Sequence, residues 1–92
     1  MPLSEIETTI LLVMPRGQKL AKVHLLAMTK ISPGAFHRAV DSLIEKGLMN
    51  EEEEKVFPRR KLISLTRYGT EVAEFLYQVE DRLRKAKKLA EA

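Results

Sequence analysis

Two short clusters of cationic and small side chains carry the chemistry that this sequence offers. The first cluster consists of Lys30, Ser32, Gly34, Ala35, His37 and Arg38, and the second consists of Arg59, Arg60 and Lys61. Guanidinium and ammonium groups bind phosphate oxygens, and an arginine can also donate two parallel hydrogen bonds to a guanine edge. These residue types therefore indicate binding of a polyanion, which suits the net charge of +3 and the pI near 9.3.

Patterns for catalysis and for metal binding are absent from the sequence. The chain has no cysteine, no glycine-rich phosphate loop and no nucleophile elbow. Its two histidines, His24 and His37, lie thirteen positions apart, and no further ligand pattern joins them. We therefore predict that the chain is not an enzyme and that it holds no metal ion and no cofactor.

The first cluster lies at the start of a helix with clear capping signals. Ser32 is suited to the N-cap, and Pro33 to the first helical position, where the missing N–H is not needed. Ile31 and Phe36 have the spacing of a hydrophobic staple, and Gly47 is suited to end the helix. The predicted buried stripe is Phe36, Val40, Leu43 and Ile44.

The opposite face of this helix is predicted to point away from the domain. It carries Gly34, Ala35, His37, Arg38, Asp41 and Ser42. A DNA major groove about 12 Å wide admits a helix, and the first turn of a helix favours a phosphate. We expect His37 and Arg38 to contact bases or phosphates. Asp41 would repel phosphates, so we expect it to pair with Arg38 or Lys46.

From Met49 the apolar period changes to two, which predicts a hairpin with strands over residues 49–55 and 60–65. The first strand is too acidic for a core strand, so the hairpin should project into solvent. Its cations could bind DNA, or they could pair with Glu51 to Glu54 across the strands, at under about 1 kcal/mol for each pair. The glutamates could also hold the cations in register or weaken non-specific DNA binding.

Two further helices are predicted before the first cluster. Ser4 is a plausible N-cap for a helix that Pro15 and Gly17 end. A second helix is predicted from about Lys19 to Met28. Its inward residues would be Leu20, Val23, Leu26 and Ala27, with His24 and Leu25 toward the flank.

A last helix is predicted from its cap Thr66 to about Ala90, with a seam of apolar residues spaced by four and three. The seam consists of Val72, Leu76, Val79, Leu83, Ala86 and Ala90. Phe75 and the first half can pack on the domain, whereas the second half has nothing of its own chain to rest on. We predict a homodimer through this helix and the first one, antiparallel because the basic end would repel a parallel copy.

Residues 32–69 resemble the DNA-binding lobe of MarR-type winged helix regulators, a pattern shared with PadR-like and small archaeal winged helix proteins. Residues 36–48 are similar to the family's recognition helix and its glycine stop. Arg59, followed by Leu-Thr-Arg-Tyr-Gly at 65–69, is similar to the wing arginine and the entry to the next helix. The resemblance implies that Gly34, Ala35, His37 and Arg38 face the major groove and that Arg59 enters the minor groove. The family usually has an acidic residue two positions before that arginine, and this chain has Phe57 at that position.

Together these patterns predict a mainly α, α+β fold: a winged helix-turn-helix with a hairpin wing and a long C-terminal dimerisation helix. Residues 1–92 would form a single domain, with the helix-turn-helix and wing over about 1–65 and the dimerisation helix over about 66–92. The predicted function is sequence-specific binding of double-stranded DNA as a homodimeric transcriptional regulator. The alternative is a winged helix that contacts protein within a larger transcription or chromatin assembly. No apolar run approaches the ~20 residues of a membrane span and no secretory signal is visible, so we expect a cytoplasmic protein without a membrane partner.

Overall fold

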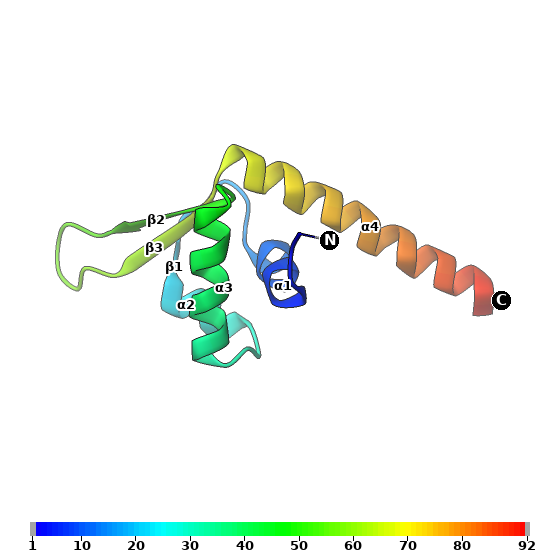
Figure 1. The fold of residues 1–92 in the computed structure, drawn as a ribbon, viewed down its shortest axis with the longest axis horizontal. Helices are drawn as coiled ribbons and strands as arrows, with labels where there is room; N and C mark the ends of the chain where they lie inside the picture. The colour runs from blue at the N-terminus through cyan, green and yellow to red at the C-terminus, as the bar shows by residue number, and fades with distance from the viewer. Residues whose placement is uncertain (1, 92) are drawn as a thin grey trace.

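The computed structural model describes residues 2–91, and in them four helices surround a three-stranded antiparallel sheet. The elements are α1 (Glu5–Val13), β1 (Leu20–Ala21), α2 (Lys22–Met28), α3 (Pro33–Glu45), β2 (Met49–Glu53), β3 (Lys61–Leu65) and α4 (Arg67–Glu91). The β2–β3 hairpin projects from one end of the body and α4 from the other, so the molecule measures 55 × 26 × 22 Å (Figure 1). The predicted winged-helix fold class is confirmed.

The caps of α1 and α3 form as the sequence predicts. In α1 the Glu7 N–H donates to Ser4 Oγ (3.1 Å) and the Ser4 N–H donates to a Glu7 carboxylate oxygen (2.8 Å), which makes a capping box. At the end of α3 the Gly47 N–H donates to the Ile44 carbonyl (3.0 Å) and the Leu48 N–H to the Leu43 carbonyl (2.9 Å). Gly47 has a φ of +76°, the left-handed conformation that this ending requires.

The second helix begins three residues later than predicted. Leu20 and Ala21 are extended and form β1, in which Leu20 lies opposite Ile63 of β3. The strand order is β1-β3-β2, so this short strand covers the edge of β3 that would otherwise stay unpaired. The prediction of a helix from Lys19 was wrong because pairing across 43 positions outweighs the local helical pattern.

The buried face of α2 also differs from the prediction. Leu25, predicted to lie toward the flank, is fully buried, whereas Val23 is 68% exposed and Ala27 is also exposed. The seven-residue helix has only about two turns, and Leu25 is its buried residue. Val23 is therefore left on the same side as the hairpin.

The core lies between α1, α2, α3 and the sheet. Its largest side chains with less than 2% exposure are Phe36, Ile10, Leu11, Leu25, Leu43, Met49, Ile63 and Val40. Complete burial of such a side chain contributes about 1.5–3 kcal/mol. The hairpin strands were predicted correctly but are shorter, with Met49 opposite Leu65 and Glu53 opposite Lys61.

The start of α4 is fixed to the turn that ends α3. Thr66 caps α4 as predicted, since its hydroxyl accepts from the Gly69 N–H (3.0 Å), and the same hydroxyl donates to the Gly47 carbonyl (2.7 Å). The Thr66 N–H also donates to the Leu48 carbonyl (3.0 Å). A Cβ at Gly69 would lie 1.9 Å from that carbonyl oxygen, so only glycine fits here.

Only the first half of α4 packs on the body. Its buried residues are Gly69 and Ala73, and Arg16 forms an ion pair with Glu74 (2.6 Å) and lies 4.9 Å from the Tyr77 ring centre. The prediction that Phe75 packs on the domain was wrong, because Ala73 faces the body instead and Phe75 is 66% exposed. Within residues 2–91, no helix is both long and apolar enough to cross a membrane.

Candidate nucleic-acid interface

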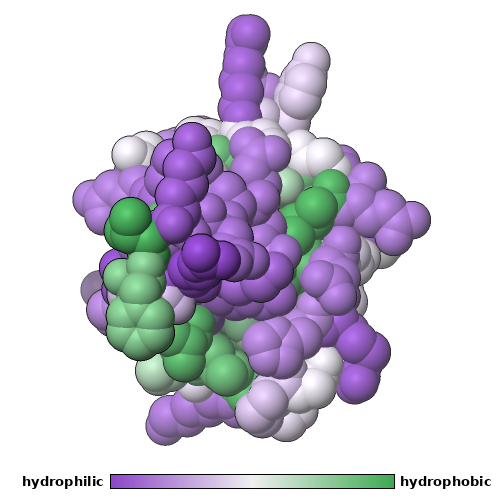
Figure 2. Space-filling model, turned by 90° about the vertical axis from the view of Figure 1, so that its left-hand side faces the viewer, coloured by the Kyte–Doolittle hydropathy of each residue, from purple (hydrophilic) through white to green (hydrophobic). Residues whose placement is uncertain are grey.

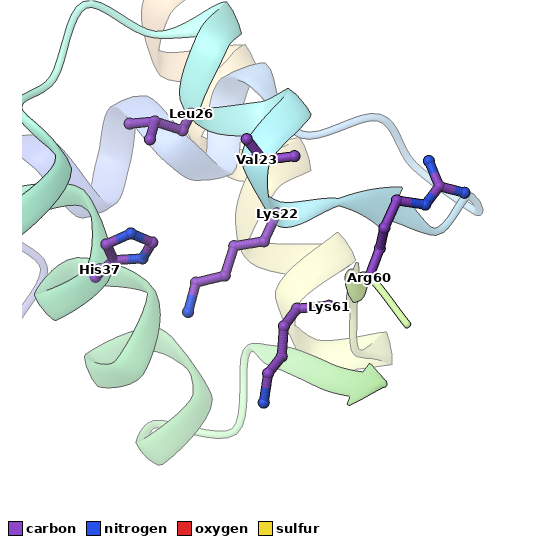
Figure 3. Close-up of a pocket in the computed structure, with 6 residues that line it drawn as sticks. All are labelled: Lys22, Val23, Leu26, His37, Arg60 and Lys61. Atoms are coloured by element: carbon purple, nitrogen blue, oxygen red, sulfur yellow. The ribbon is translucent and has the colours of Figure 1, made fainter. Parts of the chain in front are cut away.

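The hairpin and the exposed side of α3 flank a shallow hollow. Its volume is about 270 Å³, and it is lined by Lys22, Val23, Leu26, His37, Arg60 and Lys61 (Figure 3). Arg60, which precedes β3, and Lys61, its first residue, point in different directions in Figure 3. The hollow therefore joins α2, α3 and β3, with two apolar side chains among four that can carry positive charge.

The exposed stripe of α3 has a basic beginning and an acidic end. Along the helix it presents Gly34, His37, Arg38, Asp41 and Glu45. His37 borders the hollow beside the hairpin and its ring meets the Phe36 ring edge-on at 5.5 Å. The Arg38 guanidinium lies back along the helix, so a Cβ at Gly34 would be 3.4 Å from its Nη1. Phosphates are attracted to Arg38 in the first half of this stripe and repelled by Asp41 and Glu45 in the second half. The first two turns of α3 are therefore the part of the helix that can approach a polyanion.

Two residues predicted to point away from the domain lie instead on the flank beside α1. Ala35 and Ser42 are half-buried, and Ser42 Oγ donates to a Glu7 carboxylate oxygen (2.9 Å). Lys30 and Ser32, which precede α3, are exposed. The Ser32 hydroxyl makes no hydrogen bond to the first turn of α3, so the N-cap position is confirmed without its side-chain bond.

The predicted ion pair of Asp41 with Arg38 or Lys46 was wrong. Lys46 Nζ instead donates to Glu7 (2.7 Å) and to the Pro2 carbonyl (2.9 Å), and no carboxylate–cation pair within residues 2–91 includes Asp41. Glu7 is 5% exposed, and a buried carboxylate attracts a cation more strongly than an exposed one does.

Glu7 ties α1 to the end of α3, a role that the sequence analysis missed. Burial raises the pKa of its carboxyl, but hydrogen bonds from Lys46, from the Ser4 backbone and from Ser42 outweigh burial and lower the pKa to about 2. Glu7 therefore stays ionised and holds α3 in a fixed orientation against α1. The spacing of Ser4 and Glu7 is that of a capping box and could have indicated Glu7. No sequence pattern indicates its distant partners Ser42 and Lys46.

Each glutamate of β2 and the adjoining residue 54 pairs with a different cation. The pairs are Lys22–Glu51 (3.1 Å), Lys19–Glu52, Lys61–Glu53 (3.7 Å) and Arg60–Glu54 (2.8 Å). The Arg60 pair is bidentate, and this hydrogen bonding lowers the pKa of Glu54. The alternative in which the hairpin cations pair with these glutamates holds for Arg60 and Lys61, and within residues 2–91 it does not hold for Arg59. The Lys19–Glu52 and Lys61–Glu53 pairs are exposed and therefore weak, so phosphates can compete for these two cations, whereas the Lys22 and Glu51 side chains are only 16% and 25% exposed.

The tip of the hairpin holds Arg59 differently from its neighbours. Residues 56–59 form a turn in which the Arg59 N–H donates to the Val56 carbonyl (2.8 Å), and Arg59 itself has a φ of +56°. Arg59 is exposed, and it takes part in none of the ion pairs of residues 2–91. The same holds for Lys30 and Arg38 in the described chain. These three cations are therefore available to an anionic ligand.

Three seam residues of α4, Val72, Leu76 and Val79, border a second, apolar hollow. Val72 and Leu76 are half-buried, whereas Val79, Leu83 and Ala86 are exposed. The hollow has a volume of about 530 Å³ and is lined by Pro2, Leu3, Lys46, Leu48, Val72, Phe75, Leu76 and Val79. This surface combines α4 with Pro2 and Leu3, which precede α1, whereas the predicted dimer interface combines α4 with the first helix itself.

No family model and no curated protein matches the sequence. Among solved structures, the chain is similar to the adhesin competence repressor AdcR of Streptococcus pyogenes, with a TM-score of 0.80 and 20% identity over 97% of this chain and 66% of that one. A mutant of ZitR from Lactococcus lactis gives 0.78 and 27% over 97% and 61%, and MarR gives 0.78 and 24% over 91% and 61%. The chain thus spans about two thirds or less of the length of these proteins.

These structural neighbours are MarR-family regulators, so the predicted MarR-like winged helix is confirmed as the fold of this chain. ZitR is described as a zinc-responsive member of that family. In the part of this chain that the structure describes, no three His, Cys, Asp or Glu side chains are grouped to hold a metal ion.

Proposed function

We propose that this chain is a non-enzymatic transcriptional regulator that binds double-stranded DNA sequence-specifically as a homodimer. The observation that carries the proposal is the placement of Arg38 and Arg59. One lies on the first turns of α3 and the other at the hairpin tip, and within residues 2–91 neither is neutralised by a carboxylate. The MarR-like fold supports the same function. We propose a cytoplasmic location because a bacterial-type regulator works where its DNA is.

The first two turns of α3 enter the major groove in this proposal. Gly34 lets the helix come close, Arg38 reads a base or phosphate, and His37 does the same from the side of the hairpin. Ala35 forms the edge toward α1, and Asp41 and Glu45 keep the second half of the helix away from phosphates. The unpaired N–H groups of the first turn favour a phosphate beside Ser32 and Lys30.

The hairpin acts as the wing. Arg59 is the cation that reaches the minor groove, whereas Arg60 and Lys61 contact the backbone after phosphates displace their glutamate partners. Each cation keeps an anionic partner in this exchange, because a phosphate takes the place of the carboxylate.

The dimer uses α4 and the N-terminal segment. A second copy fits the apolar hollow between them, because Val79 and Leu83 are more than half exposed on a helix that extends past its own domain. Antiparallel α4 helices bring Glu71, Glu74, Glu80 and Asp81 of one copy near the basic residues 82–88 of the other. Such a two-fold dimer carries two recognition helices roughly 34–36 Å apart on a pseudo-palindromic site.

The test is duplex binding measured against salt concentration. We expect log K to fall linearly with log salt, with a slope of about −3.6 if four phosphates are neutralised. Arg38→Ala should lose about 1–3 kcal/mol of discrimination between the selected site and random duplex. Arg59→Ala should weaken both and flatten the slope, and Arg67→Ala, an exposed arginine on α4, is the matched control. Affinity no better than millimolar at low salt, or independent of salt, would refute the proposal.

A further inference from the structure

We infer that Phe57, with Pro58 beside it, is an apolar wedge that enters the minor groove and unstacks a base step, so that the wing bends the DNA. The inference rests on the proposed DNA binding and adds an activity to it. Arginine at a wing tip accounts for attraction to the groove, but it does not account for the apolar residues that precede it.

Phe57 is exposed more than any other large apolar side chain in residues 2–91. Its exposed fraction is 92%, and that of the adjacent Val56 is 73%. Single exposed apolar residues are ordinary, but three apolar residues in a row at a hairpin tip leave a whole phenyl ring in water. The tip lies at the opposite end of the molecule from the free end of α4, so a dimer through α4 leaves Phe57 uncovered (Figure 1).

Hydrogen bonds fix the loop that carries Phe57. The hydrogen-bond ladder of the hairpin continues past β2 and β3, because the Glu54 N–H donates to the Arg60 carbonyl (3.0 Å). The Arg60 guanidinium also donates two hydrogen bonds to the Glu54 carboxylate (2.8 and 3.2 Å). The Arg59 N–H closes the turn onto Val56 (2.8 Å). Phe57 is therefore a central residue of a hydrogen-bonded turn, which reduces the entropy lost when it is inserted.

The charges around the tip favour DNA over an apolar protein surface. Lys55 and Arg59 flank the apolar residues, and neither takes part in an ion pair of the described chain. A minor groove has phosphates along both rims and base edges at its floor, so cations and an apolar wedge can be used together. Figure 2 faces the side from which the hairpin projects: most of that side is hydrophilic, and apolar groups gather in a strip along its left and lower left.

A wedge of this kind makes two effects measurable. Proteins that insert apolar side chains from the minor groove bend the duplex by about 20–90°. Pyrimidine–purine steps unstack most easily, so the site under the wing should prefer TA or CA/TG at a position that no hydrogen bond reads.

The experiment uses the full chain and a duplex from selection of bound sequences. 2-Aminopurine at the step under the wing reports unstacking, and fluorescence transfer between the duplex ends reports bending. Phe57→Ser should remove at least half of both signals and weaken binding about three- to tenfold, whereas Phe57→Leu, which keeps a wedge, should retain them. Tyr68→Ser is the matched control, because Tyr68 is an exposed aromatic residue away from the tip.

Thermal unfolding checks that each variant is folded. We expect this result because Phe57 is exposed and contributes little to the core. Unchanged bending and unstacking in Phe57→Ser would overturn the wedge. The proposed function would still stand in that case if the wild type bound DNA in a salt-dependent way. Weaker binding without a change in either signal would also overturn it, because Phe57 would then only touch the backbone. Binding of the tip to protein or to lipid vesicles, with no DNA signal from the wild type, would overturn both proposals.

Discussion

Replacing Glu7 by Gln should destabilise the protein in a pH-dependent way. Gln has the same shape and can still accept the Ser42 hydrogen bond, but it loses the charge that attracts Lys46. The change therefore removes one ion pair from the contact between α1 and the end of α3. The capping box is weakened rather than lost, since glutamine is also suited to that position.

The magnitude follows from the pKa of Glu7, which is lowered from 4.5 to about 2. At about 1.4 kcal/mol per pH unit, this corresponds to an upper limit of about 3 kcal/mol of stability at neutral pH. The Lys46 side chain is 36% exposed, and solvent screens its charge, so we expect about 1–3 kcal/mol. Because the folded-state pKa is below the unfolded one, this stability is fully present above pH about 5 and disappears as the pH falls toward about 2.

The assay is urea unfolding of the wild type and of Glu7→Gln at intervals from pH 2 to pH 7. The difference in unfolding free energy should be constant above pH about 5 and shrink toward zero near pH 2. Glu54 and Asp81 also have lowered pKa values, but they are unchanged in the variant and cancel in the difference. Lys46→Gln and the double variant complete a cycle that isolates the pair. Equal stability at pH 7, or a difference that does not vary with pH, would refute the role assigned to Glu7.

Three further predictions test the fold, the wing and the dimer. Gly69→Ala should cost at least about 2–3 kcal/mol in thermal unfolding, because its Cβ would lie 1.9 Å from a backbone oxygen, whereas Gly34→Ala meets only a flexible side-chain end and should be neutral or slightly stabilising. Replacing the glutamates of residues 51–54 by Gln should tighten binding to random duplex and steepen its salt dependence, and unchanged random binding would show that the ion pairs do not compete with phosphates. Val79→Asp or Leu83→Asp should give monomers in light scattering and weaken binding to a palindromic site, and a wild type that is already a monomer with full affinity would refute the dimer.

The parts of the fold that were predicted correctly have local signals. The start and end of α3 follow from Ser32, Pro33 and Gly47, and the start of α4 from Thr66, because capping interactions join residues a few positions apart. The hairpin could be predicted because the spacing of apolar residues changes to a period of two from Met49. Fold class could therefore be predicted from the sequence.

The parts that failed depend on tertiary pairing. Two residues of β1 have no pattern of their own, and only β3, more than 40 positions away, makes them a strand. The same pairing shortens α2, in which Leu25 is buried and Val23 is exposed. Lys46 finds Glu7 across 39 positions, a partner that no helical spacing can suggest. In the candidate interface, the residue types were predictable, but their partners were not.

The partners matter because they divide the cations into two sets. In the proposed complex, Lys22, Arg60 and Lys61 would exchange a glutamate for a phosphate, so their net contribution to binding would be the difference between two similar ion pairs. Arg38 and Arg59 exchange only water for the ligand. The contacts of Lys22, Arg60 and Lys61 would therefore add little affinity on any DNA sequence. Arg38 and Arg59 would add most affinity where a base edge accepts their hydrogen bonds or where the minor groove is narrow. The acidic strand would thus lower affinity for random DNA more than affinity for the proper site, and would increase specificity without touching a base.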